Sequence, residues 1–184
     1  MSGLGLRVTL VVALVVLIGL ALIAPSQRAE DREVGIEGVR TYADLSRDHV
    51  SPPIEYEQTP PVGGPHVEVW LACDGQVYDA PVADESAVHS LEHGAVWITY
   101  TDALSSDEVA DLADQIEGGG YRFLSPYPDQ DAPVMLTAWG LQLSVESVDD
   151  PRIDEFLVAF SNGPQTPEPG ATCAAPTSGM DESV

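Results

Sequence analysis

Residues 87–100 read Ala87-Val-His-Ser-Leu-Glu-His-Gly-Ala-Val-Trp-Ile-Thr-Tyr100, and the rest of the chain can be placed around this stretch. Asp84 or Ser86 can cap a helix that begins here, and Gly94 ends it after about two turns. Residues 95–100 are apolar and rich in strand-forming types, which predicts a buried strand. The stretch therefore indicates a short helix followed directly by a strand of a sheet.

The C-terminal side continues this alternation. Apolar periodicity and turn residues predict, in chain order, a helix from Ser105 or Ser106 to Glu117, strands at 121–124, 134–139 and 141–145, and a helix at 152–161. The predicted fold class is α+β, a single compact domain with a small mixed sheet packed by helices.

The N-terminal side is less regular. Residues 42–65 contain five prolines and two glycines, which exclude a long helix and predict an extended segment that lies on the core. Val67–Leu71 alternates in polarity and predicts a strand. Residues 76–81 indicate a turn or a short strand.

An uncharged apolar run, Val8–Ala24, predicts one N-terminal transmembrane helix. Its 17 residues would span about 25 Å, the lower limit for a hydrocarbon core of about 30 Å. A cleaved signal peptide is the alternative, but the run is long and Leu22 occupies a position where cleavage favours a small residue. We expect a signal anchor at 8–24, with residues 1–7 in the cytoplasm and a juxtamembrane linker at 25–40.

The two cysteines, Cys73 and Cys173, indicate an exported domain closed by one disulfide, with a pair of free thiols as the alternative. No CxxC motif supports thioredoxin-type chemistry. We therefore expect a single-pass protein of the cell membrane. Residues 41–173 would form an extracytoplasmic domain and residues 174–184 a disordered tail.

The charge of the chain restricts its partners. The formal net charge is −23, and all seven basic residues are arginines. Such an acidic surface disfavours nucleic acids, and it is typical of a solvated surface adapted to high salt. No glycine-rich phosphate loop follows a predicted strand, so no nucleotide is expected. Nothing in the sequence identifies a protein partner.

The four histidines are the main functional signal. His89 and His93 are four residues apart, which on a helix places both imidazoles on one face. His66 follows a Gly-Gly-Pro turn and supplies a third candidate ligand, with His49 as a further candidate. We expect a copper or zinc site at His66, His89 and His93. The alternative is a structural or interaction domain of a membrane complex whose histidines are hydrogen-bonded internally.

Residues 89–93 also match the HxxEH pattern, in which Glu92 would be the general base of a metal-dependent hydrolase. Two features count against this third hypothesis. Gly94 ends the helix directly after the second histidine, and no motif supplies a third, carboxylate ligand. The sequence therefore favours a binding protein over an enzyme.

Several strings resemble the bacterial domain-of-unknown-function family numbered 3105. They are Thr59-Pro-Pro-Val-Gly-Gly-Pro-His66, the stretch 87–100, Leu124-Ser-Pro-Tyr-Pro128, Thr137-Ala-Trp-Gly140 and Gly163-Pro-Gln-Thr-Pro-Glu-Pro-Gly170. The resemblance covers about residues 41–173. It implies an envelope protein with one N-terminal membrane helix, and it implies no activity. It also implies that the residues at motif positions are His49, His66, Cys73, His89, Glu92, His93 and Cys173.

Overall fold

A computed structural model describes residues 35–175, which form one mixed α+β domain with a six-stranded sheet and three helices. The strands are β1 (Arg40–Thr41), β2 (Asp74–Val77), β3 (Val96–Tyr100), β4 (Arg122–Pro126), β5 (Val134–Ala138) and β6 (Leu141–Val145), and the helices are α2 (Asp84–Glu92), α3 (Ser106–Ile116) and α4 (Arg152–Phe160). From α2 onward this order confirms the predicted one.

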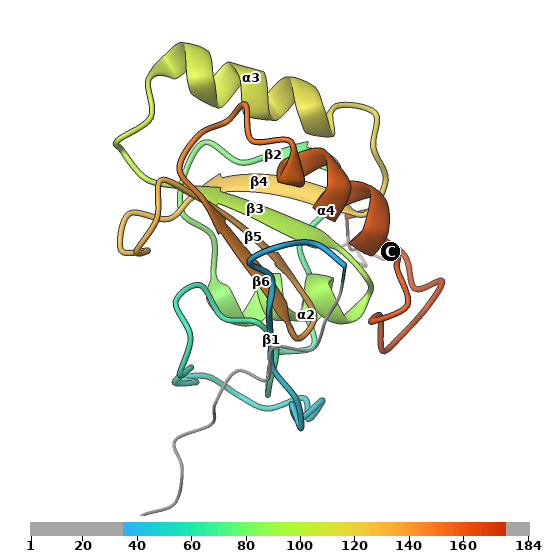
Figure 1. The fold of residues 1–184 in the computed structure, drawn as a ribbon. Coiled ribbons are helices and arrows are strands. Elements are labelled where there is room, and N and C mark those ends of the chain that lie inside the picture. The colour runs from blue at the N-terminus through green and yellow to red at the C-terminus, as the bar shows by residue number, and fades with distance from the viewer. Residues whose placement is uncertain (1–34, 176–184) are drawn as a thin grey trace, which may run out of the picture.

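The sheet has the strand order β1-β6-β5-β3-β4-β2 (Figure 1). β3 and β4 are parallel neighbours joined through α3, whereas β5 pairs antiparallel with both β3 and β6. β2 adds to β4 in parallel at one edge, and β1 adds to β6 antiparallel at the other. The α3 crossover and the tight β5–β6 hairpin account for the mixed character of the sheet.

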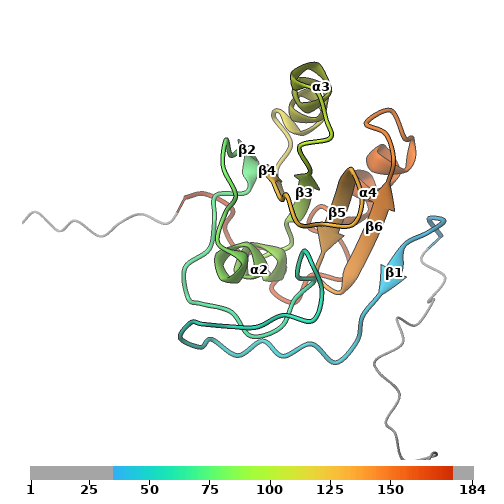
Figure 2. The same ribbon diagram turned by 90° about the vertical axis from the view of Figure 1, so that its left-hand side faces the viewer.

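The two faces of the sheet are covered by different elements (Figure 2). Ile98 and Leu124 pack on one face against α3 and α4. Trp97 and Phe123 point to the other face, where they stack at 5.6 Å beneath α2. Successive strand residues alternate between faces, so one apolar strand can serve two cores. The face that carries α2 also carries the candidate site.

Helix α3 begins with a reciprocal capping box. The backbone amide of Glu108 donates to the Ser105 hydroxyl oxygen, and the backbone amide of Ser105 donates to the Glu108 carboxylate. This satisfies two donors that the helix would otherwise leave unpaired. The predicted start of the helix is confirmed.

The strand predicted at Val67–Leu71 is wrong. The segment is extended but pairs with no strand, and Val69 is 58% exposed, so the alternation does not bury one face. Its backbone is held by the Ser90 side chain of α2, whose hydroxyl oxygen accepts from the Leu71 amide at 2.9 Å and lies 3.0 Å from the Leu71 carbonyl oxygen. A helix side chain replaces the sheet partner. The strand of this region is β2, three residues further on.

The packed part of the chain starts before residue 41. Val39 is buried in the α3–α4 core and Ile36 packs against it, so the last residues of the predicted linker lie on the domain. The transmembrane helix predicted at 8–24 and most of the tail at 174–184 lie outside the described residues. Between residues 35 and 175 no helix is long and apolar enough to cross a bilayer.

The predicted disulfide is present. Cys73 and Cys173 are bonded with their Cα atoms 4.8 Å apart, and the Cys73 amide donates to the Cys173 carbonyl at 2.9 Å. Both cysteines are buried beside α2. The bond therefore fixes the C-terminal segment against the face that carries the candidate site.

Replacing both cysteines by serine should lower the free energy of unfolding by about 4 kcal/mol, because the bond closes a loop of 100 residues. Denaturant titration of the oxidised wild type and of the Cys73→Ser, Cys173→Ser double variant, followed by near-ultraviolet circular dichroism, measures the difference. The reduced wild type is the control and should match the variant. A loss below about 1 kcal/mol would contradict this account of the bond.

Candidate metal centre

Two extended segments and one helix bring the candidate residues together. Helix α2 presents His89 and Glu92 from adjacent turns. His49 and His66 form an isolated parallel bridge, in which the Val50 amide donates to the His66 carbonyl at 2.8 Å. Backbone pairing therefore brings a histidine from each of two loops to the surface of α2.

Steric crowding explains why a glycine occupies position 63 in the Gly-Gly-Pro turn before His66. Gly63 has a φ of +141°, and a Cβ atom there would lie 2.8 Å from Leu45 and 3.2 Å from Trp139. A residue with a side chain could not bring the backbone this close. The glycine thus seats His66 against the core.

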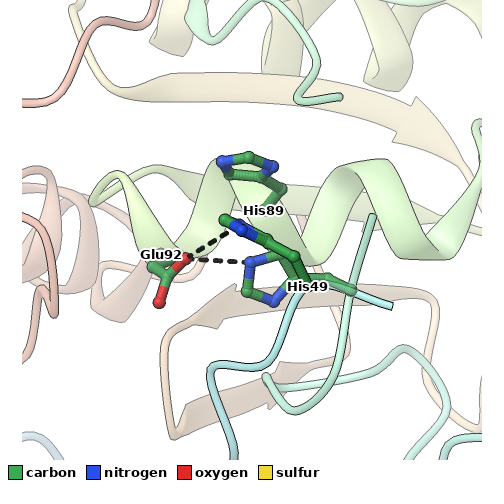
Figure 3. A group of neighbouring side chains, drawn as sticks. His49, His89 and Glu92 are labelled. Atoms are coloured by element: carbon green, nitrogen blue, oxygen red, sulfur yellow. Dashed lines mark ion pairs between the residues drawn. The ribbon is translucent and has the colours of Figure 1, made fainter. Parts of the chain in front are cut away.

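His49, His66, His89 and Glu92 form one group in which each offers a donor atom within 4.8 Å of all the others. Figure 3 labels three of them, His49, His89 and Glu92. The Glu92 carboxylate lies at the centre of the ion pairs, with Oε2 2.8 Å from Nε2 of His66 and 3.9 Å from Nε2 of His49. His66, His89 and Glu92 are 0, 5 and 2% exposed, whereas the His49 side chain is 41% exposed. Three donors are buried and one is at the surface.

Backbone carbonyls set the orientation of the buried imidazoles. Nδ1 of His66 lies 2.9 Å from the Gly64 oxygen, and Nδ1 of His89 lies 2.7 Å from the Val67 oxygen. A carbonyl only accepts, so Nδ1 donates its proton and Nε2 of the neutral ring keeps its lone pair. This is the arrangement that protein metal sites use to orient histidine ligands.

The contact between His66 and Glu92 is incomplete. Their nearest atoms are 2.8 Å apart, yet Nε2 of His66 is fully buried and makes no hydrogen bond. Two lone-pair acceptors at this distance repel unless a positive charge, either a proton or a metal ion, lies between them. A proton on His66 or a metal ion would each supply that charge.

The pKa of His89 is lowered to about 4, chiefly by burial and also by the neighbouring rings of His93, His66 and His49, against the opposing bond to the Val67 carbonyl. The His89 ring is thus neutral near pH 7. A neutral imidazole is the form that binds a metal ion.

His93, one of the three predicted ligands, is not in this group of four. Its Nδ1 donates to the Thr172 carbonyl at 2.8 Å, and its Nε2 lies 3.9 Å from Glu168. Its ring is 4.6 Å from that of His89. Helical spacing predicted a pair of His89 and His93, four positions apart. The structure instead groups His89 with Glu92, three positions on, a spacing that also places both residues on one helix face.

The HxxEH hypothesis requires both histidines of the motif as ligands and Glu92 as a free base. In the structure Glu92 is itself one of the four clustered donors, and His93 is not. Glu92 therefore lies among the candidate donors and does not stand apart from them as a free base would. This arrangement gives the hydrolase hypothesis no support.

Because the pKa of His89 is lower in the folded than in the unfolded chain, its neutral form favours folding. The metal-free protein should be most stable above pH 6.5 and should lose stability as the pH falls from 6.5 toward 4, where the unfolded state takes up a proton that the folded state does not. Urea titrations with a chelator at pH 7, 5.5 and 4.5 measure this slope. In His89→Asn, which has no titrating ring, the slope should be smaller; equal slopes would contradict the assignment.

The comparisons with known proteins add one match. Neither a curated protein nor a solved structure matches the chain. Residues 49–175 match the family described as "Protein of unknown function (DUF3105)", a range that begins at His49 and includes all four clustered residues and both cysteines. The match covers more than half of the chain, so this protein belongs to the DUF3105 family.

Proposed function

We propose that this chain is a membrane-anchored extracytoplasmic protein that binds one transition-metal ion, zinc or copper, through His49, His66, His89 and Glu92. The observation that carries the proposal is the convergence of these four donor atoms within 4.8 Å, three of them from buried residues. Buried polar groups are costly unless they are paired, so a group of this kind needs a reason to persist.

The donor set suits these metals. Around zinc, with bonds of about 2.0 to 2.2 Å, tetrahedral donors lie about 3.3 to 3.6 Å apart, so a contraction of the group would complete the site. Three imidazoles and one carboxylate match the ligand preferences of zinc and of copper(II). None of the four clustered residues offers sulfur, which disfavours copper(I).

Two features support the proposed location. The uncharged run at 8–24 has the length and composition of a membrane anchor, and the Cys73–Cys173 bond is of a kind that persists in oxidising compartments. Together they favour a domain held at the outer face of the cell membrane.

One observation favours the alternative, a structural or interaction domain without a metal. His66, His89 and His93 each have Nδ1 at a backbone carbonyl, as internal structural histidines do. Those bonds leave Nε2 of His66 facing Glu92 at 2.8 Å, where the metal-free hypothesis needs a proton on the ring and the metal hypothesis needs an ion. The two hypotheses therefore differ in whether Nε2 of His66 binds a metal ion.

Replacing a histidine by asparagine tests the role of Nε2, because it removes that atom and keeps a donor near the position of Nδ1. The asparagine amide nitrogen occupies roughly the position of Nδ1 and can still donate to the carbonyl, but no second ring nitrogen remains. Full-length protein purified in detergent, loaded separately with zinc and copper(II) and desalted, should retain about one ion per chain of at least one metal. His66→Asn and His89→Asn should each retain almost none.

His93→Asn is the matched control, because it keeps the bond to the Thr172 carbonyl and lies outside the four clustered donors. It should retain the wild-type amount of metal. Elemental analysis after desalting gives the stoichiometry, and circular dichroism confirms that each variant is folded. Folded wild type without metal after loading would refute the proposal, and metal lost equally from His93→Asn would refute the ligand set.

A further inference from the structure

The four clustered residues differ in their access to solvent. His66, His89 and Glu92 are buried, and His66 and His89 are backed by Trp139 and Trp70, with ring centroids 6.0 and 5.6 Å apart. The His49 side chain is 41% exposed. The group thus has a closed side and one open side, and His49 stands on the open side.

A surface pocket of about 400 Å³ lies on that side. It is lined by His49, Val50, Ser51, Pro52, Val67 and Glu68. Val67 links the pocket to the buried ligands, because its carbonyl holds Nδ1 of His89. The exposed Glu68 places a carboxylate at the pocket wall, where it would attract a cation from solvent. The pocket therefore meets the group at His49, which is its one exposed donor.

His49 is also held less firmly than the other donors. Its Nε2 lies 3.9 Å from Glu92, against 2.8 Å for His66. The residue belongs to an irregular segment that is tied to the group by the isolated bridge with His66. A rotation of this one exposed side chain would open the group without moving the buried donors.

We infer that the site is an exchange site, in which the metal ion is cargo that enters and leaves through the His49 pocket, with His49 as the releasable ligand and Glu68 as the first point of capture. The inference rests on the proposed metal binding and specifies what the site does with the ion. A structural zinc site keeps all four protein ligands on the ion. Here the fourth ligand, His49, is exposed beside a pocket, so its release would open one coordination position.

The test measures release and uptake in the full-length protein loaded with the metal that it retains. Release into an excess of chromogenic chelator should be about tenfold or more faster in His49→Asn than in wild type, because three buried donors still hold the ion but its outer ligand is gone. His49→Asn should nevertheless still bind about one ion per chain when the ion is in excess. Uptake by Glu68→Gln should be slower at low salt, by about twofold or more, and should equal wild type in about 1 M salt.

Glu155→Gln is the control for Glu68→Gln, because it removes one exposed charge from α4, on the opposite face of the sheet, and should leave both rates unchanged. Wild-type release rates in His49→Asn, or complete loss of binding in that variant, would overturn the inference while metal binding by the wild type still stood. Equal uptake by Glu68→Gln and Glu155→Gln would overturn the capture role. Absence of metal from the wild type is a different outcome, which removes the proposed function itself.

Discussion

The docking of the extended segment 66–71 on helix α2 is the contact on which the site depends. Ser90 holds both backbone groups of Leu71, and His89 binds the carbonyl of Val67, four residues earlier in the segment. These bonds satisfy backbone groups that no neighbouring strand satisfies. They also bring His66, at the start of the segment, over Glu92. One set of hydrogen bonds thus determines both the course of the chain and the spacing of the buried donors.

Much of the fold could be predicted from the sequence where local signals agreed with the tertiary structure. The box of Ser105 and Glu108 marked the start of α3, and the apolar runs on either side of Gly140 marked the β5–β6 hairpin. Short edge strands left no such signal: β1 has two residues, and β2 contains a glycine. The alternation at 67–71 was misleading because a helix side chain, not a strand, satisfied that backbone.

The candidate site could also be predicted only where local sequence signals agreed with the tertiary structure. His66 and His89 were correctly expected to lie together, since one follows a constrained turn and the other lies on the helix face nearby. The inclusion of His49 depends on a bridge between two irregular segments, which no local pattern encodes. Helical spacing alone could not decide between positions 92 and 93, because both neighbour His89 on an ideal helix and α2 ends at Glu92.

The outer strands of the sheet bear on self-association. An exposed strand edge offers unpaired amides and carbonyls to a second molecule, and long flat edges promote aggregation. Here one edge is the two-residue β1, and the other is β2, whose pairing with β4 shifts register between Asp74 and Gln76. Neither edge presents a long regular ladder. The described domain is thereby protected from growing its sheet by addition of further copies, even where high salt screens the repulsion between its many carboxylates.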